Sequence, residues 1–347
     1  MRLHMTRYII RRLLLLIPVL LGMTVIAFTV TRAIPTDPIV ASISQEASNH
    51  PEIVAAYRAK WGLDKPLPVQ YLTYLVNLLH GDMGVSIYTH RPVVEDLIDY
   101  LPATVELATV TIFFSVFLSI PLGILAAMRR GGVIDFVVRV LTLAGVAMPI
   151  FWLALVMLNI FYLNLAWAPA PGRLDYGLPP PPPVTRLYII DALLAGEPAV
   201  AWNALAHLAL PAFVLATWSV GLLTRMTRAS MLTVLPQDFL RNVRSKGARD
   251  FYVIRRHAAP NAMVPVVTVI GLAYGDLLSG ALLVETIFGW PGIGRYAYNA
   301  AVHVDFPSII GVALVVGFIY TIVNLLVDLL YALLDPRVRS SLIAVRA

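Results

Sequence analysis

Long apolar stretches separated by polar segments dominate the chain of 347 residues. A run of about 20 apolar residues with few charges is long enough to cross the hydrocarbon core of a bilayer as a helix. Six such runs occur, at residues 9–30, 102–128, 133–165, 204–223, 262–284 and 309–334. Because a spanning segment must satisfy its backbone hydrogen bonds internally, the pattern predicts an all-α, polytopic membrane protein with six transmembrane helices.

The segments around these runs predict the domain organisation. Residues 1–32 hold an N-terminal segment and an uncleaved first span, because the apolar run is too long for a signal peptide and no small-residue cleavage site follows it. Residues 33–100 form an outer loop, in which helical spacing at residues 51–61 with Gly62 as a stop predicts short helices. Residues 101–347 form the core, including a loop at 226–261. Prolines in or near the spans, such as Pro149, predict kinks.

Composition and charge support this interpretation. The chain is 59% hydrophobic and 13% charged, with a mean hydropathy of +0.78, which is too apolar for a soluble fold. The net charge of +6 does not indicate nucleic-acid binding, because the cations gather at the ends of apolar runs. Most of the 26 Lys and Arg residues fall on the side that holds both termini, so the positive-inside rule predicts cytoplasmic N- and C-termini.

Enzymatic signatures are missing from the sequence. None of the three lysines follows a glycine and precedes Ser or Thr, so the chain has no P-loop for ATP. The seven histidines show no metal-binding spacing, no G-x-S-x-G motif occurs, and there are no cysteines for thiol chemistry. We therefore expect a non-catalytic protein with no cofactor or metal of its own. The energy for any transport must come from elsewhere.

A basic segment at residues 238–260 is the most informative feature of the chain. Its four cations at Arg241, Arg244, Lys246 and Arg249 cannot lie in hydrocarbon. Gly247 follows a helical run at a position suited to a left-handed residue, and Asp250 is placed to cap a second short helix. The segment therefore predicts a helix, a sharp corner and another helix at the membrane surface.

Motifs spread over nearly the whole chain carry a family resemblance. They are Thr36-Asp-Pro38, Trp61-Gly-Leu-Asp-Lys-Pro-Leu-Pro-Val-Gln-Tyr71, Gly81-Asp-Met-Gly84, Leu101-Pro-Ala-Thr-Val-Glu106, Arg244-Ser-Lys-Gly247, Asn261-Ala-Met-Val-Pro265, Glu285-Thr-Ile-Phe-Gly-Trp-Pro-Gly-Ile-Gly294, Asn324-Leu-Leu-Val-Asp-Leu-Leu-Tyr331 and Asp335-Pro-Arg337. In this order the chain resembles the dipeptide, oligopeptide and nickel branch of ABC importer permeases. The resemblance implies the type I importer fold.

The resemblance also implies how the chain would work with partners. The basic segment resembles the loop that docks in a groove of the ATP-binding subunit, although Arg241, Asn242 and Val243 replace the usual Glu-Ala-Ala. The implied coupling residues are Arg241, Asn242, Val243, Arg244, Ser245, Lys246, Gly247, Ala248, Arg249 and Asp250. The implied partners are two ATP-binding subunits that hold ATP and Mg, a second homologous permease and an extracytoplasmic substrate-binding protein. The implied location is the bacterial inner membrane.

Polar residues within the spans are candidates for the translocation pathway, because charges in a membrane usually face a cavity or a partner. The candidates are Asp276, Glu106 and Ser279, with snorkelling as the preferred alternative for Glu106 and a buried hydrogen bond as the alternative for Asp276. Asp328 lies near the inner end of the last span. We expect it to pair with Arg255 or Arg256 and so fix the loop to the bundle.

One other class of transporter is compatible with these residues. A stand-alone secondary transporter or channel would be driven by an ion gradient through Asp276 and Glu106, but the sequence lacks the internal repeat that many such proteins show. The substrate cannot be identified from the sequence. Short peptides are what the resemblance implies first, with nickel, glutathione, opines and oligosaccharides as alternatives.

Overall fold

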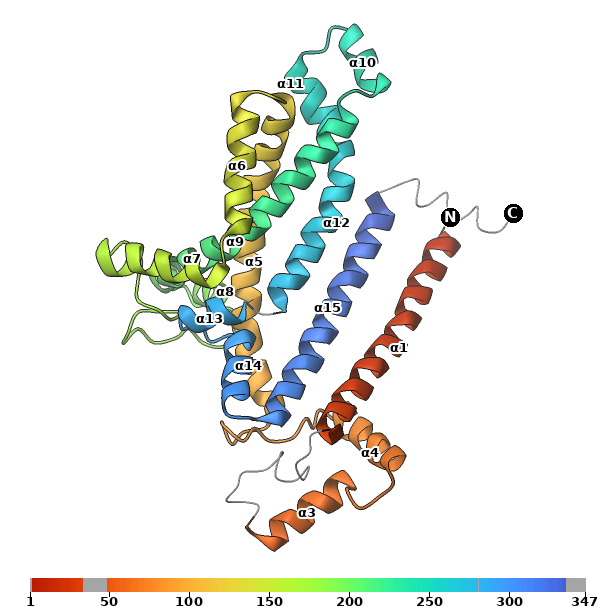
Figure 1. Ribbon diagram of the computed structural model, residues 1–347, viewed down its shortest axis with the longest axis vertical. Helices are drawn as coiled ribbons and strands as arrows, with labels where there is room; N and C mark the ends of the chain where they lie inside the picture. Colours follow the sequence, from red (N-terminus) through yellow and green to blue (C-terminus); the bar gives the residue numbers. More distant parts are fainter. Residues whose placement is uncertain (1, 34–48, 280, 335–347) are drawn as a thin grey trace.

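The computed structural model describes residues 2–33, 49–279 and 281–334, and regular structure in these residues is helical apart from one isolated antiparallel bridge between Val85 and Pro92. Long helices run along the longest axis of the molecule, and shorter helices lie at its two ends and beside its middle (Figure 1). This arrangement confirms the predicted all-α class. In the described residues, five segments are long and apolar enough to cross a membrane, and a bent pair makes a sixth.

The first, second and fourth predicted runs lie in helices that are longer than the runs themselves, whereas the helix of the fifth run ends at Leu278, before the run does. The long helices are α1 (Arg2–Ala33), α5 (Val93–Met128), α9 (Pro198–Val234), α12 (Ala259–Leu278) and α15 (Phe306–Leu334). At 1.5 Å per residue, the 36 residues of α5 span about 54 Å, which exceeds the thickness of the hydrocarbon core. The ends of α5 therefore project outside the bilayer.

The third predicted span is not one straight helix. It consists of α6 (Val133–Ala147), α7 (Ile150–Met157) and a π-helical continuation, η1 (Leu158–Asn164), and the two parts meet at 99°. Pro149 causes the break, because its ring disfavours helical backbone at Met148, which has extended angles of φ −75° and ψ 131°. The kink predicted at Pro149 is confirmed, and it is sharp enough to redirect the chain.

Small residues let the core helices approach closely. A Cβ on Gly123 of α5 would lie 2.6 Å from Thr227 of α9, and one on Gly221 of α9 would lie 2.8 Å from the carbonyl oxygen of Thr142 in α6. Such contacts leave no room for a side chain and are typical of helix packing in membranes. The main buried apolar cluster joins α5, α9, α12, α13 and α15. α9 is therefore the central helix of the bundle.

Short helices lie beside the middle of the bundle and toward the end opposite α10 (Figure 1). They are α3 (Pro51–Trp61), α4 (Leu67–Leu79), α8 (Tyr188–Leu194), α13 (Leu282–Ile287) and α14 (Ile293–Val302). α3 ends at Gly62, which has left-handed angles of φ 61° and ψ 34°, as its sequence predicts. Tyr71 of α4 packs edge-on against Phe28 of α1, so this region is attached to the first span.

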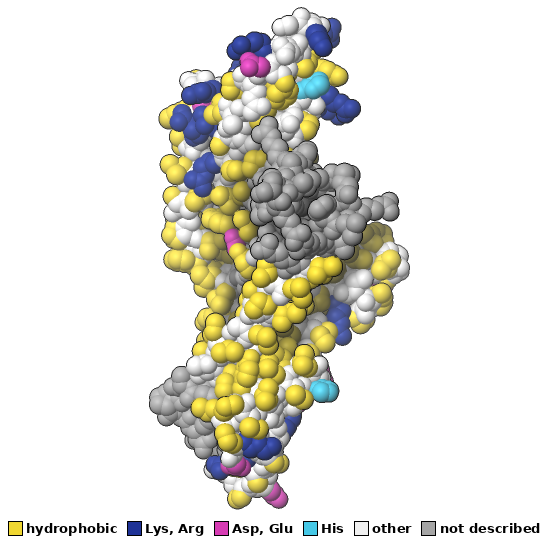
Figure 2. Space-filling model, turned by 90° about the vertical axis from the view of Figure 1, so that its right-hand side faces the viewer, with side chains coloured by type: hydrophobic (Ala, Val, Ile, Leu, Met, Phe, Trp, Pro, Cys, Tyr) yellow, Lys and Arg dark blue, Asp and Glu magenta, His cyan; other side chains and the backbone are white. Residues whose placement is uncertain are grey.

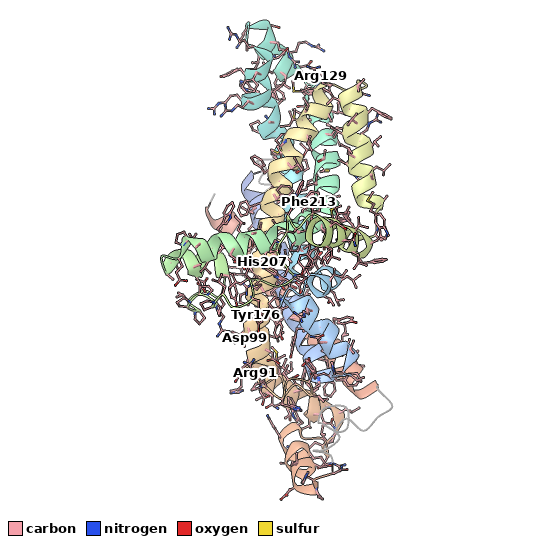
Figure 3. The ribbon with its side chains drawn as sticks, turned by 90° about the vertical axis from the view of Figure 1, so that its left-hand side faces the viewer. Arg91, Asp99, Arg129, Tyr176, His207 and Phe213 are labelled. Atoms are coloured by element: carbon pink, nitrogen blue, oxygen red, sulfur yellow. The ribbon has the colours of Figure 1, made fainter. Side chains whose placement is uncertain are left out.

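The opposite end carries the basic segment, folded as α10 (Asp238–Ser245), α11 (Asp250–Val253) and η2 (Ile254–Ala258). Figure 2 shows cationic side chains gathered at this end, whereas apolar side chains cover much of the described surface between the ends. Figure 3 shows Arg129 at this end of α5, with Arg91 and Asp99 toward the other. The two ends of the bundle therefore differ in charge.

Candidate coupling loop and translocation pocket

The basic loop (residues 238–260) is anchored to the bundle by apolar residues, chiefly Leu240 of its first helix, with Val243 packed beside it. Leu240 is fully buried in a cluster with Met231 of α9, Val253 of α11 and Ala262 of α12. The cationic residues Arg241 and Arg244 of the same helix remain exposed. α10 therefore has an apolar side that holds it to the bundle and a charged side that faces away from it.

The corner between α10 and α11 depends on Gly247. This residue has a φ of +81°, in the left-handed region that glycine adopts without strain and that β-branched residues avoid. No atom lies within 4 Å of the position that its Cβ would occupy. The requirement for glycine is therefore conformational and does not arise from crowding, and the predicted helix, corner and helix are confirmed.

The predicted capping role of Asp250 is wrong. Arg249 occupies the N-cap position of α11, because its backbone is already extended at φ −64° and ψ 142°, and Asp250 is the first helical residue. The Asp250 carboxylate instead accepts a hydrogen bond of 3.2 Å from Nε of Arg244. This contact links α10 to α11 across the corner.

A groove of about 450 Å³ lies beside the basic loop. Its lining includes Met128 at the end of α5, Arg130, Leu232 of α9, and Arg244 with its partner Asp250. The groove thus combines apolar side chains with two cations and one carboxylate. Outside its lining, the wholly buried Asp135 of α6 accepts hydrogen bonds from Nε of Arg228 at 2.6 Å and Nη2 at 2.9 Å, which link α6 to α9.

Glu106 does not snorkel as expected. It is buried and forms an ion pair of 2.5 Å with the equally buried Arg173, which lies in the loop between η1 and α8 (residues 165–187). Its second oxygen accepts a hydrogen bond of 2.9 Å from the backbone N–H of Ile189. The guanidinium of Arg173 also stacks 3.5 Å from the ring centre of Tyr188. Glu106 therefore holds this loop and the start of α8 against α5.

Asp276 lies in a different environment. It is exposed in the last turn of α12 and lines a pocket of about 490 Å³ between α7, α9, α12 and α13. Ser279, which follows α12, is half-buried and donates a hydrogen bond of 2.9 Å to the carbonyl oxygen of Gly275. The structure therefore places Asp276 and Ser279 at the same helix end and Glu106 outside this pocket.

The predicted pairing at the inner end of the last span stays a prediction. Arg255 and Arg256 lie in η2 with exposed side chains. The side chain of Asp328 lies outside the described residues.

Sequence reasoning missed the role of Glu285. This fully buried residue of α13 accepts a hydrogen bond of 2.8 Å from Thr104 of α5 and one of 3.0 Å from the backbone N–H of Arg295 in α14. Burial raises the pKa of Glu285, and these hydrogen bonds oppose the rise. A Cβ on Gly292 would lie 2.5 Å from the carboxyl group, so the glycine makes room for it.

The same contacts join two motifs that carry the family resemblance. Thr104 accepts a hydrogen bond of 2.8 Å from the N–H of Ile293, and the ring N–H of Trp290 donates to the carbonyl of Ala103 at 2.8 Å. The segment 101–106 therefore packs against the segment 285–294. The sequence did contain a signal for the role of Glu285. In residues 285–294 an acidic residue is followed by closely spaced glycines, and glycines before a helix are typical of helix N-termini that bind anions.

Comparison with known proteins identifies the family. The description "Binding-protein-dependent transport system inner membrane component" matches residues 119–340, and the N-terminal part of the same kind of component matches residues 5–108. The chain belongs to this family. It contains the permease subunits of binding-protein-dependent importers, so this chain is a non-catalytic permease subunit, and ATP hydrolysis resides in a partner.

Individual relatives agree over nearly the full length. The chain is 45% identical to the probable D,D-dipeptide transport system permease protein DdpB of Escherichia coli K12, over 93% of this chain and 94% of that protein. It is 43% identical to the dipeptide transport system permease protein DppB of Alkalihalophilus pseudofirmus, over 96% and 100%. The family decides against the stand-alone secondary transporter or channel considered above.

A solved structure supports the fold. The MetNI methionine ABC transporter in an inward-facing conformation matches with a TM-score of 0.50 and 14% identity, over 69% of this chain and 96% of that chain. The predicted type I importer fold is confirmed. The family also means that the chain is a multi-pass inner membrane protein that works with ATP-hydrolysing and substrate-binding components.

Proposed function

We propose that this chain imports short peptides and is moved by ATP-binding subunits that dock on residues 241–250 of the basic loop. The observation that carries the proposal is the geometry of that loop, in which Leu240 is buried in the bundle while the cationic side of α10 is exposed. The names of the relatives, which refer to dipeptide and D,D-dipeptide transport, support peptides as the substrate class.

The proposal extends to the whole assembly. The chain supplies one basic loop, so a pair of ATP-binding subunits with bound ATP and Mg requires a second, homologous permease to receive the other subunit. An extracytoplasmic binding protein delivers the substrate at the opposite end of the bundle. The cationic end shown in Figure 2 supports a cytoplasmic position for the basic loop and both termini, because cations beside spans are retained on that side.

Transport would be coupled to ATP hydrolysis mechanically. Closure of the ATP-binding subunits displaces α10, and its buried Leu240 transmits the movement to the ends of α9 and α12. The hydrogen bond between Arg244 and Asp250 keeps α10 and α11 together during this movement. A packed contact of this kind transmits displacement because protein interiors have low compressibility.

Substitution of Gly247 tests the proposal. In the complete transporter, Gly247→Val forces a β-branched residue into the left-handed region, which changes the corner, whereas Gly247→Asn preserves it because asparagine tolerates these angles. We expect Gly247→Val to reduce ATP-dependent uptake of a labelled dipeptide into proteoliposomes about tenfold or more. The ATPase subunits should still hydrolyse ATP, so the ratio of transport to hydrolysis falls.

Gly196→Val is the matched control. Gly196 has a φ of +74° and equally open surroundings, but it lies between α8 and α9, away from the basic loop. It carries the same backbone strain and should leave the ratio of transport to hydrolysis unchanged. Parental uptake by Gly247→Val, in a complex that assembles normally, would refute the coupling role of the loop.

A further inference from the structure

The pocket beside Asp276 has walls that are almost entirely apolar. They include Ile150 of α7, Leu215 and Trp218 of α9, and Leu282 and Leu283 of α13. Its volume of about 490 Å³ falls in the range of pockets that hold small ligands, which combine apolar walls with a few placed polar groups. Here Asp276 is the one ionisable residue of the lining.

The Asp276 carboxylate has no cationic neighbour in the pocket. In the part of the chain that the structure describes, it forms no hydrogen bond and no ion pair, and its side chain is exposed to the pocket. A carboxylate among apolar side chains in a membrane segment is unfavourable unless a cation or donor reaches it. The residue therefore lacks a structural partner that would explain it.

The end of α12 adds a second source of negative potential. Asp276 lies in the last turn of this 20-residue helix, where backbone carbonyl groups give the helix a partial negative charge. The carbonyl of Gly275 receives hydrogen bonds from both the N–H and the hydroxyl of Ser279, but a negative side chain at this helix end still destabilises the helix. A cation in the pocket would relieve both effects.

The residues that line the pocket favour an organic cation over a metal ion. A divalent metal ion needs several oxygen, nitrogen or sulfur ligands to replace its water, and in the described residues no group of three His, Cys, Asp or Glu is placed to hold one. An organic ammonium needs only one carboxylate. The carbon atoms that it carries can pack against apolar walls, so one molecule satisfies both features of the pocket.

We propose that Asp276 binds the protonated amine of the transported substrate, with an adjacent apolar side chain packed against Trp218 and Leu282. This inference rests on the proposed peptide import, because a peptide presents an ammonium group beside its first side chain. It makes Asp276 a residue that determines substrate specificity, favouring molecules with a free amine over molecules in which the amine is blocked.

A thiol reporter can measure occupancy of the pocket, because the native chain has no cysteine. Leu283 lines the pocket and is exposed, so Leu283→Cys in the complete transporter provides a single maleimide-reactive group on this chain. The assay follows the labelling rate of this chain in proteoliposomes without the binding protein. Leu-Gly, N-acetyl-Leu-Gly and Ni²⁺ are added separately as the probes.

We expect Leu-Gly to slow labelling and N-acetyl-Leu-Gly and Ni²⁺ to have little effect. Adding Asp276→Asn should raise the concentration of Leu-Gly needed for half-protection about tenfold or more, because the ion pair is lost. Asp276→Glu should retain most of the protection. Glu197→Gln, which removes an exposed carboxylate at the start of α9, should leave it unchanged.

Three results would overturn this inference: no protection by Leu-Gly, equal protection by Leu-Gly in Asp276→Asn, or equal protection by the blocked peptide. Protection by Ni²⁺ that matches that of Leu-Gly would identify a metal site and would also overturn it. ATP-dependent uptake of Leu-Gly by the parent transporter is measured in the same proteoliposomes. Uptake of Leu-Gly without protection of the cysteine would refute only the proposed role of Asp276. Absence of Leu-Gly uptake would refute the proposed function itself.

Discussion

At the scale of single residues, the ion pair between Glu106 and Arg173 gives the sharpest stability prediction. Both side chains are buried, so Glu106→Ala leaves an unpaired guanidinium inside the protein. We expect the free energy of unfolding to fall by about 3–5 kcal/mol, measured by denaturation of the purified protein in detergent.

An exposed ion pair serves as the control that separates the effect of burying the two charges from the effect of pairing them. Asp64 also pairs with an arginine, Arg58, at 3.8 Å, but both side chains are largely exposed. Asp64→Asn should change the free energy of unfolding by less than about 1 kcal/mol, because water screens an exposed pair. Equal losses for the two variants would contradict the anchoring role of Glu106.

Residue roles could be predicted from the sequence only where the deciding contact is local. Gly247 was predictable, because a glycine after a helical run is a common C-terminal signal and needs no distant partner. The partner of Glu285 was not, because Thr104 lies 181 positions away and the glycines that follow Glu285 do not indicate which residue binds its carboxylate. The sequence likewise did not indicate that Arg173 reaches Glu106 from another loop.

At the scale of elements, the loop between η1 and α8 (residues 165–187) is held by Asp191 of α8. Its buried carboxylate accepts hydrogen bonds of 2.7 Å from both the N–H and the hydroxyl of Thr185 and one of 2.8 Å from the N–H of Arg186. Burial alone would raise the pKa of Asp191, but these hydrogen bonds outweigh it and lower the pKa below the usual value of 3.8. The folded protein therefore favours the ionised form.

This shift predicts a dependence on pH. Because the pKa is lower in the folded state, the stabilisation is fully present above pH 3.8 and is lost as the pH falls through the folded-state pKa. Asp191→Asn should lower the free energy of unfolding by about 1–3 kcal/mol at pH 6, and this difference should shrink below pH 3.8. Unfolding temperatures at pH 6 and pH 3 measure it. A difference that is the same at both values would contradict the role of the carboxylate.

Hydropathy predicted the existence of the elements better than their limits. α9 continues past the predicted run at 204–223, because Arg225 and Arg228 end the apolar pattern but not the helix. The third run of 33 residues would span about 50 Å as a straight helix, more than a bilayer requires, and Pro149 was the local signal for the break within it. The direction taken by α7 after the break depends on packing against α9 and α13, which the sequence does not reveal.

At the scale of the whole molecule, the fold class, the number of spans and the family were predictable because each rests on signals repeated along the chain. The arrangement of the pocket beside Asp276 was not predictable, since four separate elements contribute its walls. The difference in charge between the two ends of the bundle was also predictable, because many Lys and Arg residues along the chain contribute to it.

This difference predicts which end of the bundle faces the cytoplasm. The prediction is simple to test because the chain has no cysteine.

Single cysteines at the two ends of the bundle would report its orientation. Figure 3 shows Arg129 at the end near the basic loop and Tyr176 on the side of Asp99, and both side chains are exposed. Because Arg129 belongs to the cationic end, the positive-inside rule places it in the cytoplasm. A membrane-impermeant maleimide should label Tyr176→Cys in intact spheroplasts and Arg129→Cys only after permeabilisation. The cysteine-free parent controls for background, and the reverse pattern would place the basic loop outside the cell, beyond the reach of any subunit that hydrolyses cytoplasmic ATP.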